Sequence, residues 1–238
     1  MTVLFISDIH LSPKRPELFR AFSKFLKEQA SQASALYILG DLFDAWIGDD
    51  DPSDLAFDTK RALRHLSDNG VDLFIQRGNR DFTLGKRFSK EVRGTIIKDE
   101  HIVTCGDVSA LVMHGDSLCT DDIEYQKFRR KSRNPIYRWC LINLPLKTRL
   151  GIAKKWRTGS ASAKSGKAID IMDVNNDAVL SVMKKYEVAT LIHGHTHRPQ
   201  IHNISSGQRL VLGDWGSQGW FVAFDTEGFS LHSFPIAQ

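Results

Sequence analysis

Seven residues of the kinds that bind metal ions occur in short polar motifs along the chain. Three of them offer a carboxylate or amide oxygen and four an imidazole nitrogen: Asp8, His10, Asp41, Asn79, His114, His195 and His197. Seven ligands are too many for one metal ion and suit two, which can share a hydroxide and clamp a phosphoryl oxygen. Mixed oxygen and imidazole ligands without thiolate suit Mn²⁺, Fe or Zn, and the share of carboxylates favours Mn²⁺, so we expect two Mn²⁺ ions per chain. A carboxylate between the ions would offset their repulsion, and Asp41 is the natural bridge.

Each motif directly follows a short apolar run, which predicts that a buried strand ends there. The runs occupy residues 3–6, 37–39, 73–75, 111–113 and 191–192. In an α/β sheet, strand ends at one edge converge on a single crevice, where ligands bind. If the strand geometry continued, alternation would also point Asp8 and His10 to the same side. We therefore expect the seven side chains to meet at one edge.

Other polar residues near these motifs are expected to have supporting roles. Asp44 is predicted to orient a metal ligand as a hydrogen-bond acceptor, and His193 to be buried beside the ligands. Residues 49–51 are all Asp and precede Pro52. Three carboxylates in a row look like a metal site, but Asp-Pro is typical of turns and caps. We predict a turn there, with Pro52 at an early position of a helix.

The spacing of apolar residues predicts the elements that position these motifs. Residues 16–30 carry a helical stripe, and a second helix over 54–69 ends at Gly70. From about residue 98 the pattern is typical of strands, and the chain closes with strands over 210–212, 220–224 and 229–234. Alternating strands and helices followed by short late strands predict an α/β fold, in which two sheets pack face to face with helices outside.

The chain is expected to divide into a core, residues 1–119 and 187–238, and an insertion, residues 120–186. Within the insertion, residues 129–167 contain twelve Lys and Arg and no Asp or Glu, whereas acidic residues outnumber basic ones in the rest of the chain. A basic segment in an acidic body predicts a surface for an anionic partner.

The insertion is helical in pattern, with breaks expected at Pro135, Pro145 and Gly159 and a loop over 160–166. Aliphatic residues and Trp are interleaved with its Lys and Arg. This apolar content exceeds what a solvated basic face needs, so we expect an exposed apolar patch of the kind that marks a lipid or partner site.

Length and composition fit one globular domain with an insertion: 238 residues, 42% hydrophobic and 25% charged. No run reaches the roughly 18 apolar residues of a membrane span. The chain enters a strand directly after Met1, so no signal peptide is expected and the cytoplasm is the expected compartment. Cys105, Cys119 and Cys140 are odd in number and far apart, which fits reduced thiols.

The conjunction of these motifs resembles the calcineurin-like metallophosphoesterases. The motifs are Asp8-x-His10, Gly40-Asp41-x-x-Asp44, Gly78-Asn79-Arg80-Asp81, His114-Gly115-Asp116 and Gly194-His195-Thr196-His197. The resemblance covers residues 1–119 and 189–234 and implies a four-layer α/β/β/α sandwich with a dinuclear site. It implies that one metal is bound by Asp8, His10, Asp41 and His197, and the other by Asp41, Asn79, His114 and His195.

One position departs from the family pattern, in which Gly-Asn is followed by His rather than Arg80. A histidine there is taken to stabilise the transition state or to protonate the leaving group. Arg80 stays charged at any working pH and cannot be a general acid. It can hold a phosphate bidentately and stabilise developing charge. This favours a substrate with a good leaving group, such as a phosphate ester in a pyrophosphate.

Longer motifs over 41–50, 78–82, 113–122 and 195–199 resemble a bacterial family of pyrophosphatases that cleave UDP-2,3-diacylglucosamine in lipid A biosynthesis. This resemblance covers essentially the whole chain. It implies Mn²⁺-dependent attack of water on the α-phosphorus, giving UMP and 2,3-diacylglucosamine 1-phosphate, by a peripheral enzyme at the cytoplasmic face of the inner membrane. Matching substrate-contacting positions are Asn79, Arg80, Asp122, Ser160, Lys164, Lys167 and His195; Asn79, Arg80 and His195 are the expected catalytic residues.

On this reading the insertion is a lid. A substrate with two acyl chains and a diphosphate needs an apolar chamber beside cationic groups, and a basic helical lid with Trp and Leu would also lie on an anionic membrane. A solvated basic face is the alternative for Lys164 and Lys167 taken singly.

Two other functions are compatible with parts of the pattern. The first is a phosphoesterase acting on nucleic acid or cyclic nucleotides, but the aliphatic stretch over 141–150 is unlike a nucleic-acid groove. The second is a membrane-binding scaffold with an inactive body, which the seven competent ligand types argue against. We expect a monomer and no nucleic-acid partner.

Overall fold

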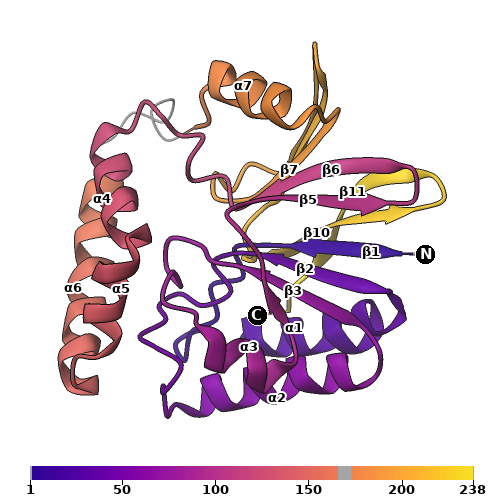
Figure 1. Ribbon diagram of the computed structural model, residues 1–238. Helices are drawn as coiled ribbons and strands as arrows, with labels where there is room; N and C mark the ends of the chain where they lie inside the picture. Colours follow the sequence, from indigo (N-terminus) through magenta and orange to yellow (C-terminus); the bar gives the residue numbers. More distant parts are fainter. Residues whose placement is uncertain (1, 166–172, 238) are drawn as a thin grey trace.

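A computed structural model describes residues 2–165 and 173–237, without the side chains of 157–165. Two sheets lie face to face (Figure 1). The first has the order β11 (Gly228–Pro235), β10 (Gln218–Asp225), β1 (Val3–Ile6), β2 (Ala35–Leu39), β3 (Asp72–Gln76), β4 (Thr95–Ile96). The second has the order β5 (Glu100–Cys105), β6 (Val108–Met113), β7 (Thr190–His193), β9 (Gly207–Val211), β8 (Gln200–Ile204).

Helices cover the outer faces of both sheets. The first sheet packs against α1 (Pro16–Glu28), α2 (Asp54–Asp68) and α3 (Lys86–Val92), and α7 (Asn176–Tyr186) lies on the second sheet (Figure 1). A short 3₁₀ helix, Ala30–Gln32, follows α1. The predicted α/β class and the α/β/β/α layering are confirmed.

The burial of β1 shows why the strands are continuous apolar runs. Val3 and Phe5 point into the core between the two sheets, whereas Leu4 and Ile6 point into the core beneath the helices. Successive side chains of a strand alternate between its faces, so a strand covered on both sides must be apolar at every position.

The insertion stands beside the sandwich as three helices (Figure 1): α4 (Ile123–Arg133), α5 (Pro135–Ile142) and α6 (Leu146–Ser165). The predicted breaks at Pro135 and Pro145 are confirmed. The break at Gly159 and the loop over 160–165 are wrong, because α6 continues to Ser165; residue 166 lies outside the described residues. One glycine costs a helix only about 1 kcal/mol, and α6 is otherwise rich in good helix formers.

The end of the insertion also differs from the prediction. Val179, Val182 and Met183 of α7 are buried against Leu111 of β6 and Leu191 of β7. This packing makes α7 the outer layer of the second sheet, so the boundary drawn at residue 186 is better placed before α7.

The predicted turn at residues 49–51 is confirmed, since the Asp51 N–H donates to the Gly48 carbonyl oxygen at 3.1 Å, but the expected helical position of Pro52 is wrong. Ser53 caps α2 by accepting a hydrogen bond from the Ala56 N–H at 3.2 Å, so Pro52 precedes the helix. Asp49 accepts from the N–H groups of Gly85 and Phe88 at 3.0 and 2.9 Å and so caps α3. The sequence analysis missed α3, β4 and β8, which are short or largely exposed.

Candidate metal centre

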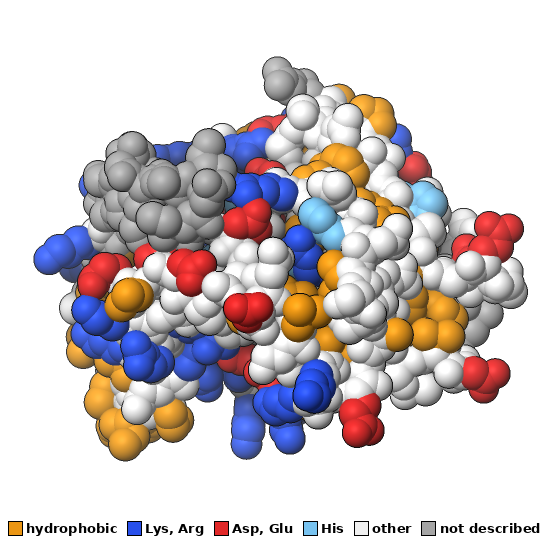
Figure 2. Space-filling view, turned by 90° about the horizontal axis from the view of Figure 1, so that it is seen from above, with side chains coloured by type: hydrophobic (Ala, Val, Ile, Leu, Met, Phe, Trp, Pro, Cys, Tyr) orange, Lys and Arg blue, Asp and Glu red, His pale blue; other side chains and the backbone are white. Residues whose placement is uncertain are grey.

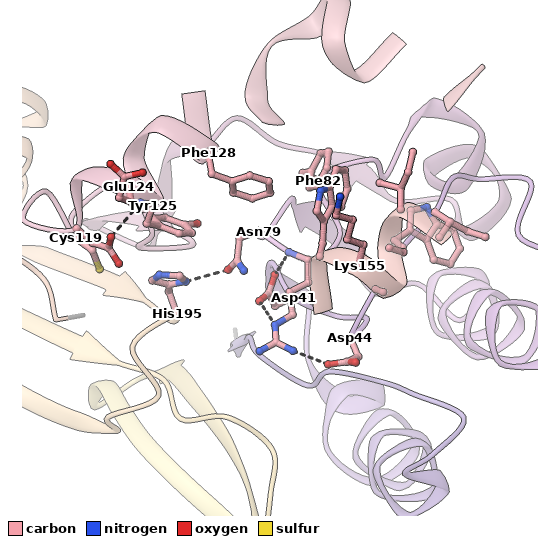
Figure 3. Close-up of a pocket in the computed structure, with 18 of the residues that line it drawn as sticks. Asp41, Asp44, Asn79, Phe82, Cys119, Glu124, Tyr125, Phe128, Lys155 and His195 are labelled. Atoms are coloured by element: carbon pink, nitrogen blue, oxygen red, sulfur yellow. Dashed lines mark hydrogen bonds and ion pairs between the residues drawn. The ribbon is translucent and has the colours of Figure 1, made fainter. Parts of the chain in front are cut away.

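The five predicted strand ends meet at one edge of the sandwich. β1 runs parallel to β2 and β2 to β3 in the first sheet, and β6 runs parallel to β7 in the second. The carboxyl ends of these strands therefore face the same side. Figure 3 shows Asp41, Asn79 and His195 converging there from different elements.

Asp8, His10 and His197 form the first group of possible ligands. His197 Nε2 lies 3.2 Å from Asp8 Oδ1 and 3.3 Å from His10 Nε2. The other carboxylate oxygen of Asp8 accepts hydrogen bonds from the Ser7 hydroxyl at 2.6 Å and the His195 N–H at 2.8 Å. These donors fix the carboxylate so that Oδ1 faces the two imidazoles.

Asn79, His114 and His195 form the second group. Asn79 Oδ1 lies 3.0 Å from His114 Nε2 and 3.0 Å from His195 Nδ1. The Nδ1 of His114 lies 2.9 Å from the carbonyl oxygen of Leu39, which accepts its hydrogen. That hydrogen bond leaves Nε2 as the basic nitrogen directed toward Asn79.

Asp41 lies between the two groups, as a bridging ligand would. Its Oδ2 is 3.9 Å from His10 Nδ1, and its Oδ1 is 3.8 Å from His114 Nε2. The Arg80 N–H donates to Oδ1 at 2.8 Å. All seven predicted ligands are thus brought together.

The backbone at the site is unusual. Seven described residues other than glycine have a positive φ, and five of them are Asp8, His10, Asp41, His195 and His197. The strand geometry that would align Asp8 and His10 by alternation does not continue, since β1 ends at Ile6 and the backbone of both residues is left-handed. Such conformations are strained and cluster at functional sites. Here they turn five side chains inward.

The donor set fits metal ions. The Nδ1 of His10 is buried and has no hydrogen-bond partner among the described residues. Burial lowers the pKa of His195 to about 3, and burial and the nearby Arg80 hold the pKa of His10 well below its usual value. Neutral imidazole is the form in which histidine binds metal ions, and both residues are held in it. The pKa of His114 is instead raised, because the effect of its burial is outweighed by the nearby carboxylates of Asp41 and Asp8.

Asp81 is a buried support that the sequence analysis did not single out. Its carboxylate accepts the N–H groups of Gly78 at 2.7 Å and Leu42 at 2.8 Å. A Cβ atom at residue 78 would lie 2.0 Å from Asp41 Oδ1, so only glycine fits there. The sequence signal for this role was the position of Asp81 itself, as the acidic residue that ends the Gly-Asn-Arg-Asp motif.

Arg80 lies beside the bridging position. Its Nη1 donates to Asp44 Oδ1 at 2.6 Å, and its Nε is 3.6 Å from Asp41 Oδ2. Asp44, expected to orient a metal ligand, therefore orients the guanidinium. His193 is fully buried, as predicted, with Nδ1 2.8 Å from the Gly194 carbonyl oxygen.

A pocket of about 590 Å³ extends from these groups to the insertion. Asp41, Asn79, Arg80, His195 and His197 line its polar end. Asp41, Asn79 and His195 can be followed in Figure 3. The rest of the wall is largely apolar and comes from the core and from all three helices of the insertion: Trp46, Phe82, Phe128, Leu141, Ile152 and Trp156.

The predicted substrate-contacting residues of the insertion are only partly described. Asp122 lines the pocket and caps α4 by accepting the Tyr125 N–H at 3.0 Å. Ser160 and Lys164 lie on α6, but their side chains are outside the described residues, as is Lys167. Tyr125 was missed: its ring centroid is 5.3 Å from that of His195, and its hydroxyl donates to Asp116 at 3.0 Å.

Part of the basic segment faces the core instead of an outside partner. Arg129 contacts Asp99 and Asp116, each at 3.0 Å. Arg149 is almost completely buried against Asp50. These arginines hold the insertion to the acidic body, so the segment's charge is only partly available to an anionic surface.

Comparison with known proteins matches residues 1–199 to the calcineurin-like phosphoesterase family. The chain belongs to this family. It is accordingly a hydrolase that uses divalent metal ions, and the sequence resemblance is confirmed. A protein of Azotobacter vinelandii named UDP-2,3-diacylglucosamine hydrolase is 47% identical over 99% of this chain and 100% of its own length. One of Ectopseudomonas mendocina with the same name is 49% identical over 98% of each chain.

An archaeal phosphodiesterase of known structure is similar in fold. It is 13% identical, with a TM-score of 0.50 over 98% of this chain and 100% of that one. At this identity the likeness supports the fold alone.

Proposed function

We propose that the chain hydrolyses the pyrophosphate bond of UDP-2,3-diacylglucosamine, giving UMP and 2,3-diacylglucosamine 1-phosphate in lipid A biosynthesis. The observation that carries this proposal is the continuity of the pocket, which joins four of the seven proposed ligands, Asp41, Asn79, His195 and His197, to an apolar wall on the insertion. A substrate with a diphosphate and two acyl chains needs a polar end for the diphosphate and an apolar end for the acyl chains. The names of relatives aligned over their whole length support it.

We further propose that the seven ligands hold two Mn²⁺ ions, with Asp41 between them. Two divalent ions would supply Lewis acidity and lower the pKa of water for attack on the α-phosphorus. The carboxylates and neutral imidazoles described above suit this metal. Asp8, Asp41 and their backbone donors would keep the two sites at a fixed separation.

Arg80, Asn79 and His195 are the proposed catalytic residues. The guanidinium of Arg80 is aimed at the site by Asp44 and would stabilise negative charge on the diphosphate. Arg80 cannot protonate the leaving group. No general acid is needed for this substrate, because the sugar phosphate leaves as a stable anion. Asn79 and His195 lie 3.0 Å apart and would position the reacting phosphoryl group. Asp122, Ser160, Lys164 and Lys167 remain proposed substrate contacts.

The insertion would also bring the enzyme to its lipid substrate. Six large apolar side chains on the described part of its three helices and their connections are exposed: Ile123, Ile136, Trp139, Ile142, Leu144 and Leu150. Figure 2 shows hydrophobic and basic side chains together at the end of the molecule where Figure 1 places the insertion. In the part of the chain that the structure describes, no helix is long and apolar enough to span a bilayer. We propose peripheral binding of a monomer at the cytoplasmic face of the inner membrane.

Hydrolysis of the lipid nucleotide in ¹⁸O-labelled water tests the reaction. Mass spectrometry should find the label in UMP, because water attacks the α-phosphorus. Label in the sugar phosphate, or faster cleavage of nucleic acid or cyclic nucleotides than of the lipid nucleotide, would contradict the proposal. Elemental analysis of protein purified from Mn²⁺-supplemented cells should give two manganese ions per chain.

A further inference from the structure

A single arginine of the insertion joins α6 to the loop after β2. The side chain of Arg149 is only 4% exposed. Its Nη1 donates to Asp50 Oδ1 and to the Ile47 carbonyl oxygen, both at 2.7 Å, and its Nη2 donates to Asp50 Oδ2 at 2.5 Å. Its Nε donates to the Leu144 carbonyl oxygen at 2.9 Å. A buried guanidinium with partners on three nitrogens fixes orientation as well as distance.

The two segments that Arg149 joins both contribute to the lining of the apolar pocket. Trp46 and Ile47, shortly before Asp50, come from the loop. Ile152 and Trp156, about one and two turns beyond Arg149 on α6, come from the insertion, and Arg149 itself is a lining residue. The contact of Arg149 with Asp50 therefore fixes how these two parts of the lining lie relative to one another.

The loop is built to receive this side chain. Gly48 has a φ of +138°, and a Cβ atom there would lie 2.3 Å from Arg149 Nη1. A larger residue would occupy the space of the guanidinium. The neighbouring carboxylate, Asp49, holds the same loop to the core through the N-terminus of α3 and the indole N–H of Trp46. Of the two adjacent carboxylates, one thus anchors the loop and the other binds the insertion.

We propose that Arg149 is a positioning residue that sets the width of the apolar end of the pocket and thereby the affinity for acyl-bearing substrates. It takes no part in the chemistry at the metal ligands. This inference rests on the proposed function for the identity of the substrate, but not for the geometry of the pocket.

Arg149→Lys is the sharpest test, because lysine keeps the charge but not the bidentate fork. The KM for the lipid nucleotide should rise about tenfold, which corresponds to 1.4 kcal/mol. The kcat/KM for bis(p-nitrophenyl) phosphate, a small soluble diester, should stay within about twofold of the wild-type value. Lys147→Met is the matched control, because it replaces an exposed residue of α6 and leaves the contact between Arg149 and Asp50 intact. It should change neither the KM for the lipid nucleotide nor the kcat/KM for the small diester.

Asp50→Asn provides a second variant that retains the two carbonyl acceptors, and it should raise the same KM by a smaller factor. Equal losses on both substrates in folded variants, or an unchanged KM in both variants, would overturn the proposal. Binding of dansylundecanoate, a fluorescent fatty acid, gives a readout that needs no turnover and should weaken about tenfold in Arg149→Lys. If the wild-type protein fails to cleave the lipid nucleotide, the proposed function fails, whereas unaltered probe binding in Arg149→Lys would reject this role for Arg149.

Discussion

Asp81 accepts a hydrogen bond from the backbone N–H of Leu42 at 2.8 Å, across the gap between the loops after β3 and β2. The same carboxylate accepts the Gly78 N–H at 2.7 Å. It thereby ties the loop that carries Asn79 and Arg80 to the loop that carries Asp41. The distance between Asp41 and the loop of Asn79 and Arg80 therefore depends on Asp81, whose side chain is buried and does not line the pocket.

Replacing Asp81 should therefore lower both the stability of the protein and its affinity for metal, although Asp81 is not a proposed ligand. Asp81→Ala leaves the backbone N–H groups of Gly78, Leu42 and Asp41 without this acceptor, each costing about 1–3 kcal/mol, so the free energy of unfolding in urea should fall by about 3 kcal/mol or more. Manganese affinity, measured by calorimetry, should fall about 10- to 100-fold. Asp107→Ala, in the exposed turn between β5 and β6, is the control and should change neither quantity. Wild-type metal affinity in Asp81→Ala would contradict this role.

The position of Asp41 between the two ligand groups predicts a severe effect of a small change. Asp41→Asn preserves the shape of the side chain and its acceptor for the Arg80 N–H, so the melting temperature without metal should stay close to that of the wild type. It removes the negative charge that two cations would share at this position. Turnover should fall by about 10³-fold or more, with less than two metal ions per chain by elemental analysis. Near-wild-type turnover at physiological Mn²⁺ would refute the bridging assignment.

Arg80→His introduces the common family motif, but we expect the variant to lose activity on the lipid nucleotide. The guanidinium is held by Asp44 and reaches toward Asp41, and an imidazole offers neither two parallel donors nor a permanent charge. The kcat/KM for the lipid nucleotide should fall about 10²-fold or more. Full activity in the histidine variant would mean that charge and bidentate geometry at this position are unimportant.

The convergence of the seven candidate ligands could be predicted because each follows a buried strand, and strand ends share an edge in any α/β sandwich. The left-handed backbone at Asp8 and His10 could not be predicted from the sequence, since only the surrounding tertiary contacts make that strained conformation stable. Likewise, the apolar stripe of α7 was visible, but nothing local distinguishes packing on the core sheet from packing in the insertion.

Charge was the least reliable guide. The run of Lys and Arg between residues 129 and 167 predicted an external anionic partner, yet Arg149 pairs with Asp50, which lies 99 residues earlier in the chain. A pair so distant in sequence leaves no local pattern. Similarly, the aspartates at 49–51 were correctly separated from the metal site, but their division between α3 and the insertion required the folded structure.

The three cysteines should differ sharply in reactivity. Burial raises the pKa of Cys105 to about 11, and burial and the nearby Asp116 raise that of Cys119 to about 12, whereas Cys140 is exposed on α5. A raised pKa keeps a thiol protonated and unreactive until the pH approaches that value. At pH 8, iodoacetamide should add one group per native chain, at Cys140, and three in denaturant, as counted by mass spectrometry. Rapid labelling of Cys119 in the native protein would contradict its burial.

The exposed apolar residues of α5 should govern membrane binding without affecting the chemistry. Ile136 and Trp139 are 72% and 64% exposed, one turn apart on a helix that also carries Arg138. Insertion of each apolar side chain into a bilayer contributes about 1.5–3 kcal/mol, and anionic lipid attracts the nearby basic residues. Changing both to Ser should weaken binding to phosphatidylglycerol-containing vesicles by at least about 10²-fold in a sedimentation assay.

Phe57 on α2 gives a matched control for this experiment. It is 63% exposed, close to the value for Trp139, but it lies on α2, in the helical layer outside the first sheet and not on the insertion. Phe57→Ser should leave vesicle binding unchanged if the insertion is the membrane face. Both variants should cleave bis(p-nitrophenyl) phosphate at the wild-type rate, because the ligands lie at the strand ends. Equal weakening of vesicle binding by both substitutions would show that exposed apolar area in general, and not the patch on α5, attracts the protein to lipid.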